Sequence, residues 1–291
     1  MDRTLIKTMK KTFFFTLMTA ALIFTWGCGS SDDDDNDEPT PTPNPSLNQE
    51  TTWTKEDKTY PLKVDWSGNE PLPEWADMAN NPDPFGYESW MILMVTLQDE
   101  LATYASDDDF MGVFINNSLR ALAKPAIFSG GDTNEVAFIL KILGNENSEE
   151  DINFKLVYYC GKLKQTFTLN GYEKFMHERV YGVEETFIIP LLEGCKKFPV
   201  HTRVTMYFST KLNDAIRPAL GDMMLVMVDG ECRGSWVIDE HQFLAPAVFN
   251  VYGRQEGEKG TVYYYNTREN SFWNTGTTIT LEPGEQNIEL N

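Results

Sequence analysis

Histidine and cysteine are scarce in this chain, so it has few of the side chains that most often bind metals or act as nucleophiles. The 291 residues include three histidines and four cysteines. None of the histidines belongs to an HxH or HExxH pattern, and there is no CxxC pair, GxSxG elbow, Walker loop or GxGxxG turn. We therefore predict a protein that is not an enzyme and uses no cofactor. Two carboxylates brought together by folding would still allow an accessory glycoside hydrolase, because sequence does not show which acids meet.

Positive charge is also in short supply. The chain has 24 lysines and arginines against 44 aspartates and glutamates, which gives a formal net charge of −20 at pH 7. Nucleic-acid binding depends on basic side chains that neutralise phosphates, and this composition has no basic stripe to supply them. The sequence therefore excludes nucleic acid as a partner.

One long uncharged apolar run lies near the N-terminus. It covers residues 12–26, follows a basic head and ends at Gly27-Cys28-Gly29. This order is typical of a secretory signal, and the run is too short for a stable membrane span. The small residues around Cys28 resemble a bacterial lipobox, which implies that residues 1–27 are a lipoprotein signal peptide and that Cys28 is acylated. A plain signal peptide with an incidental cysteine is the alternative.

An acidic and proline-rich stretch follows Cys28. Residues 28–50 include SSDDDDNDE and PTPTPNPS, which predict a disordered tether because like charges repel and prolines stiffen the chain. The acidic run resembles the export signal of surface lipoproteins of Bacteroidetes. This resemblance implies an outer-membrane lipoprotein that faces the cell exterior and is held through its lipid anchor. A solvated spacer is the simpler interpretation, and the two are compatible.

Helical patterns are rare after residue 50, and short apolar runs separated by Gly, Asn and Asp recur instead. Examples are WMILMVTL, FMGVFI, RVTMYF, MMLVMV and TVYYYN. Such runs are typical of an all-β sandwich. The predicted fold is therefore two tandem antiparallel β-sandwich units of immunoglobulin-like type. An extended segment, residues 51–84, precedes them, with a strand laid over the first unit.

The two units are predicted from a repeat. At constant spacing, Asp109 corresponds to Asp222 and Arg120 to Arg233. Asn116-Asn117 and Asp229-Gly230 fall at matching positions, and both pairs tolerate the positive φ angles of a two-residue hairpin turn. The repeat places the units at residues 85–190 and 195–291.

The paired arginines have two interpretations. A two-residue turn would place Val113 opposite Arg120, on a strand that is apolar on both faces and hence buried. A buried arginine must be paired, which favours an internal ion pair or a clamp on carbonyl groups. An anion contact repeated in each unit is the functional alternative.

The hairpin DGECRGSW, the lead-in PEWADMANNPDPFGYESWMILMVTL and the later FNVYG and GTVYYYN resemble two-repeat modules of secreted and surface proteins of Bacteroidetes. The resemblance covers most of residues 72–291. It implies the fold and a surface location, and these modules have no settled biochemical role that would imply an activity.

The candidate ligand-binding residues are aromatic and basic. Aligning INFKL with TVYYY pairs Tyr264 with Lys155 and so places Tyr264 on the outward face. An exposed tyrosine near Arg268 and Trp273 would suit stacking against a sugar ring or a protein partner. The alternative is that Trp273 caps the sandwich core.

Two weaker candidates remain. Asp107, Asp108 and Asp109 form an acidic loop that could hold calcium, although it lacks the DxDxDG spacing and a solvated turn is the simpler interpretation. Cys160, Cys195 and Cys232 are odd in number, so one disulfide with a free thiol and three buried thiols both stay open.

These observations predict a non-catalytic binding module on the cell surface, with carbohydrate as the first-guess ligand. The alternative is a structural or adhesive envelope protein that binds another protein, for instance by adding a strand at a sheet edge. The hydrolase is the third hypothesis.

Overall fold

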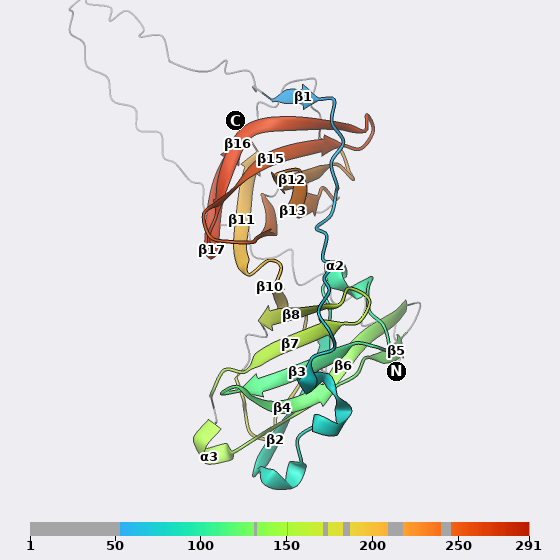
Figure 1. Ribbon diagram of the computed structural model, residues 1–291, viewed down its shortest axis with the longest axis vertical. Coiled ribbons are helices and arrows are strands. Elements are labelled where there is room, and N and C mark those ends of the chain that lie inside the picture. Colours follow the sequence, from blue (N-terminus) through green and yellow to red (C-terminus); the bar gives the residue numbers. More distant parts are fainter. Residues whose placement is uncertain are drawn as a thin grey trace, which may run out of the picture. The chain divides into compact units, whose positions relative to one another are not determined.

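The computed structural model describes residues 53–130, 133–149, 151–170, 174–182, 187–208, 218–239 and 246–290 (Figure 1). Residues 48–291 form one compact unit, to which all of these belong. The predicted signal peptide, the predicted acylation site Cys28 and the whole predicted tether, residues 28–50, lie outside the described residues. Within them, no helix is both long and apolar enough to cross a bilayer.

The predicted all-β fold is confirmed. In the described ranges, helices are limited to single turns, at η1 (Glu74–Ala76), η2 (Met78–Asn80), η3 (Pro84–Gly86), α2 (Asp99–Ala102) and α3 (Glu146–Glu149). All other elements are strands, which form four sheets. Two parallel pairs, β2 with β9 and β11 with β17, depart from the antiparallel pattern that the sequence led us to expect.

The first sandwich consists of a four-stranded and a five-stranded sheet (Figure 1). The four-stranded sheet has the order β5 (Ala126–Gly130), β6 (Thr133–Gly144), β2 (Ser89–Thr96) and β9 (Val180–Tyr181). The five-stranded sheet has the order β10 (Leu191–Cys195), β8 (Gln165–Asn170), β7 (Lys155–Cys160), β3 (Phe110–Ile115) and β4 (Ser118–Ala123).

The second sandwich is built in the same way. Its smaller sheet has the order β14 (Ala247–Gly253), β11 (Val200–Phe208) and β17 (Gly284–Leu290). Its larger sheet has the order β1 (Thr54–Glu56), β16 (Ser271–Leu281), β15 (Glu258–Asn266), β12 (Met223–Val228) and β13 (Glu231–Val237). The pairing of β12 with β13 and β15 reproduces that of β3 with β4 and β7.

Both hairpins that carry the paired arginines have the expected two-residue turn. Asn116 and Asn117 have φ angles of 50° and 62°, which asparagine tolerates at little cost. The predicted register beyond the turn was wrong, because a β-bulge lies between Val113 and Phe114 and pairs Val113 with Ala121 rather than with Arg120. A bulge leaves its extra residue unpaired and re-aims that side chain.

Strand β12 is buried on both faces, as the two-sided apolar pattern indicated. Met224, Val226 and Val228 belong to the core between the sheets of the second sandwich. Met223 and Leu225 point to the other face and join a cluster that also contains Trp66 of the N-terminal segment, with Tyr60 packed against it. The second face is therefore dry because residues from elsewhere in the chain cover it.

That cover is provided by residues 53–80, called the strap here. The expectation that its strand lies over the first unit was wrong, because β1 pairs with β16 at the edge of the second sandwich. Tyr60 then packs against Tyr263, with ring centroids 5.1 Å apart. Further along, the amide of Gly68 donates to the carbonyl of Leu163, in the first sandwich.

Candidate functional site

The first candidate is the acidic loop of Asp107, Asp108 and Asp109, in which the side chain of Asp109 is buried and hydrogen-bonded. Its carboxylate accepts hydrogen bonds from the amide and hydroxyl of Ser106, the amide of Gly161 and the hydroxyl of Tyr158. Asp107 and Asp108 are exposed at the surface. Across the described part of the chain, no group of three or more His, Cys, Asp or Glu side chains is arranged to hold a metal ion. Asp109 thus serves to close its own loop.

Tyr264 is completely buried, so its predicted outward orientation was wrong. Its hydroxyl donates to Asp222, and its ring lies 5.7 Å from that of Trp53. Burial, followed by the adjacent Asp222 carboxylate, raises the pKa of Tyr264. A tyrosine in this position fastens the strap to the core and has no face left for a ligand.

The error in placing Tyr264 has a simple geometric cause. Met111 of β3 pairs with Tyr158, and the corresponding Met224 of β12 pairs with Tyr264. Tyr264 therefore corresponds to Tyr158, three positions beyond Lys155. Because side chains alternate along a strand, a shift by an odd number of residues moves every side chain to the opposite face.

The other two predicted ligand-binding residues, Trp273 and Arg268, do not form an aromatic binding surface with Tyr264. Trp273 is half-buried, packs on the core of the second sandwich and donates from its indole nitrogen to the Ser271 hydroxyl at 3.2 Å. Arg268 is exposed, and its guanidinium lies 3.9 Å from the buried carboxylate of Asp222. Tyr264 and Arg268 therefore meet at the Asp222 carboxylate, and Trp273 is the cross-strand partner of Tyr264.

The paired arginines form internal contacts. Arg120 donates through both terminal nitrogens to Glu149, and its guanidinium lies 4.6 Å from the ring centre of Tyr87. Arg233 contacts Glu258 and the carbonyl oxygen of Tyr252. Both arginines are buried and both are charge-paired, which supports the structural interpretation over an anion site.

The three described cysteines are buried free thiols: Cys160, Cys195 and Cys232. Burial raises the pKa of all three thiols, and that of Cys232 reaches about 12. A thiol with a raised pKa is a weak nucleophile, because the thiolate is the reactive form.

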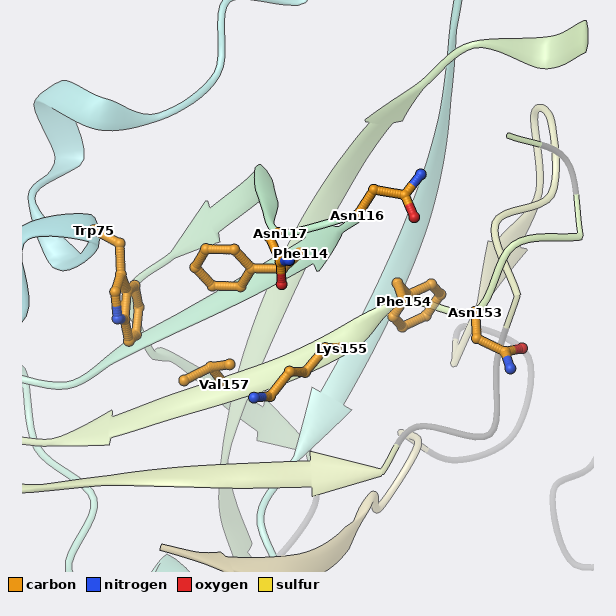
Figure 2. Close-up of a pocket in the computed structure, with 8 residues that line it drawn as sticks. All are labelled: Trp75, Phe114, Asn116, Asn117, Asn153, Phe154, Lys155 and Val157. Atoms are coloured by element: carbon orange, nitrogen blue, oxygen red, sulfur yellow. The ribbon is translucent and has the colours of Figure 1, made fainter. Parts of the chain in front are cut away.

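The clearest candidate site is a groove on the outer face of the five-stranded sheet of the first sandwich, shown in Figure 2. Its volume is about 710 Å³, within the usual range for small-ligand sites. The lining residues come from η1, from β3 and its turn, and from the start of β7: Trp75, Phe114, Asn116, Asn117, Asn153, Phe154, Lys155 and Val157.

The groove exists because the strap covers only part of this sheet face. Trp75 packs with Phe110, Leu122 and Tyr159 at one end, and its ring stands edge-on to Phe114 at 5.9 Å and 88°. The rest of the apolar face is left open between Trp75 and the start of β7.

A glycine allows Trp75 to approach the sheet. A Cβ atom at Gly112 would lie 3.1 Å from the indole ring of Trp75, closer than side chains normally pack. Gly112 is therefore the residue that fixes the depth of the groove wall.

Polar groups surround the aromatic floor. Asn116, Asn117 and Asn153 are exposed, and within the described ranges their side-chain amides make no hydrogen bond to the protein. Lys155 is the one charged side chain among the described lining residues. The groove thus combines ring faces with free amide donors and acceptors.

Sequence reasoning missed this site. Trp75 lies in the segment before the first unit, and nothing in the local pattern links it to the Asn116-Asn117 turn. The available signal was Phe114 at an outward position, two residues before a turn of two asparagines.

The fold and the groove define an all-β protein with an open surface site, and comparison with known proteins adds no family. No protein-family model matches the chain, and no curated protein matches it. A crystal structure from Bacteroides fragilis, described as a “putative cell adhesion protein”, aligns with 77% of this chain and 88% of that chain at 10% identity. The TM-score is 0.19, too low for the two folds to superpose, so nothing is inferred from this similarity.

Proposed function

We propose that the chain is a non-catalytic binding protein of the cell surface and that its groove holds carbohydrate. The observation that carries the proposal is the pairing of the Trp75 and Phe114 rings with the free amides of Asn116 and Asn117. Sugar rings have apolar C–H faces edged by hydroxyl groups. Aromatic faces together with amide donors and acceptors are the side chains that match this surface.

The composition of the groove supports a non-catalytic role. Glycoside hydrolysis uses a pair of carboxylates about 5–10 Å apart, and the described lining of the groove contains no carboxylate. Elsewhere, the Ser89 hydroxyl lies 2.7 Å from Nδ1 of His177, with Glu146 3.7 Å from the other ring nitrogen. Ser89 is only 5% exposed and does not line the groove, so this contact favours local structure over nucleophilic catalysis.

The surface location rests on the sequence. The signal-like residues 1–27, the lipobox-like Cys28 and the acidic tether support an acylated protein on the outer membrane, facing the exterior. We expect the wild-type protein to incorporate a labelled fatty acid and the Cys28→Ala variant to incorporate none. Labelling that survives Cys28→Ala would refute the anchor.

The binding proposal is tested with the full chain in mild detergent, by affinity electrophoresis against plant, microbial and host polysaccharides. We expect retardation by at least one glycan class and a loss of about tenfold in affinity for Trp75→Ala. Stacking of a nucleic-acid base on one aromatic ring is worth about 1–3 kcal/mol, and we take the lower part of that range for a sugar ring. Trp273→Ala is the matched control, because it removes a half-buried tryptophan remote from the groove. No retardation by any glycan would overturn the carbohydrate proposal.

A protein-binding role is the second candidate, favoured by the outer face of the sheet β5-β6-β2-β9. Ile139 and Val180 are 42% and 47% exposed there, on either side of β2. The corresponding face of the second sandwich also exposes apolar side chains, Tyr207 and Val248, but Arg203 and Asn250 lie beside them. This role would be supported if the wild-type protein captures an envelope protein, Ile139→Asp abolishes the capture and Trp75→Ala leaves it intact. Capture unaffected by Ile139→Asp would exclude this face.

A further inference from the structure

We infer that the groove selects acidic carbohydrate, namely a glycan whose sugars carry a carboxylate or sulfate group, and that each chain holds one such site. The inference rests on the proposed carbohydrate-binding function and names the substrate class of that same groove. The carboxylate and the sulfate are two sources of one chemistry, an anionic group on a sugar ring.

The position of Lys155 is the first argument. Lys155 is the direct cross-strand partner of Phe114, so the two side chains emerge from the same face of the sheet. Figure 2 shows both among the groove-lining side chains, with Val157 next along the strand. A sugar stacked on the Phe114 ring would therefore bring its substituents within reach of the ammonium group.

The second argument is that this ammonium group has no partner within the described part of the chain. Two other lysines, by contrast, are held by carboxylates: Lys55 by Glu269 at 3.0 Å and Lys197 by Asp65 at 3.0 Å. Lys155 makes no ion pair or hydrogen bond to any described residue and is exposed. In a chain with a formal net charge of −20, an unpaired cation beside an aromatic floor is available to a ligand anion.

The neighbouring Lys174 is paired within the chain. Lys174 bridges to Asn153 through the backbone, and its ammonium lies 3.9 Å from the Asp151 carboxylate. This pair is internally compensated and exposed. Lys155 is therefore the charged side chain that the described lining of the groove offers to a ligand.

The second sandwich lacks the equivalent site. There, Met227 pairs with Thr261 at the position where Phe114 pairs with Lys155. Met227 is 4% exposed and packs beneath the cover that includes the strap, and Asp229-Gly230 replaces the two asparagines. In the described residues, the aromatic rings, the free asparagine amides and an unpaired lysine occur together only in this groove. We therefore expect one ligand site per chain.

The test compares matched glycans by isothermal titration of the full chain in detergent. Polygalacturonate oligomers are compared with neutral galactan oligomers, and a sulfated glucan with the unsulfated glucan. We expect tighter binding of the acidic member of each pair and one site per chain. Lys155→Gln should weaken acidic binding roughly tenfold, as expected for a hydrogen bond to a charged group.

Lys259→Gln is the control, because it removes the same charge from an exposed position of the second sandwich. Equal binding of neutral and acidic oligomers, unchanged by Lys155→Gln, would overturn the inference and leave the carbohydrate proposal standing. An equal loss for both lysine variants would also overturn it, since attraction would then be diffuse. A failure of every oligomer to bind would refute the proposed function itself. Binding of only one anion type, with sensitivity to Lys155→Gln, would support the inference and identify the source.

Discussion

The contact between Tyr264 and Asp222 offers the sharpest test of how the strap side of the second sandwich is held together. Asp222 is fully buried and accepts hydrogen bonds from the Tyr264 hydroxyl, the Ala219 amide and the amide and hydroxyl of Thr267. Tyr264→Phe keeps the ring against Trp53 and removes a single donor. A hydrogen bond to a charged group contributes about 1.5–3 kcal/mol, and we expect a loss of about 2 kcal/mol because three donors remain.

The pH dependence of this loss follows from the state of the aspartate. Burial alone would raise the pKa of Asp222, but the hydrogen bonds from Tyr264, Thr267 and Ala219 outweigh it and hold the pKa below its ordinary value. A depressed folded-state pKa adds stability above the unfolded value of about 3.9, and this stability is lost as the pH falls through the folded value. The cost of Tyr264→Phe should therefore be largest near neutral pH and shrink below about pH 4.

Urea unfolding at a series of pH values measures both effects. Tyr265→Phe is the matched control, because its hydroxyl donates to the neutral side chain of Asn270 at 2.8 Å. We expect a loss of about 1 kcal/mol for this variant with little dependence on acid pH. Equal losses for the two variants at all pH values would refute the assignment of Asp222 as an ionised acceptor.

Three further predictions concern the thiols, the groove wall and the strap. The buried Cys160, Cys195 and Cys232 should resist a thiol reagent at pH 8 in the folded protein and react together on unfolding; fast reaction of any one in the native state would contradict its burial. Gly112→Val should displace the Trp75 ring and weaken glycan retardation at least as much as Trp75→Ala, while a smaller effect would show that the wall can relax. Trp53→Ala should cost about 3 kcal/mol in urea unfolding, since it opens a cavity against Tyr264, and an unchanged midpoint would show that the strap is not part of the cooperative unit.

The sequence supported the fold class and the turn geometry because both depend on local chemistry. Alternating apolar runs indicate strands, and Asn116-Asn117 accommodates positive φ angles wherever it occurs. The bulge beside Phe114 leaves no such signal, since it arises where Arg120 must turn toward Glu149, a residue far along the chain.

The prediction of the ligand-binding site was wrong for a related reason. The position of Tyr264 depended on how β15 was aligned with β7 across loops of different length, and an error of three residues in that alignment reversed its face. The groove depended on where the strap would end its contact with the sheet. That is decided by packing between Trp75 and Gly112, which no local pattern encodes.

The course of the strap also has a consequence for the order of folding. Asn274 donates a hydrogen bond to Glu56, 218 positions earlier in the chain. Contacts of such high sequence separation form late, because the entropy of closing the intervening loop is lost before the contact contributes stability. Until β1 docks, the edge of β16 stays unpaired and open to other chains. Refolding of the protein should therefore be most prone to aggregation in its final step.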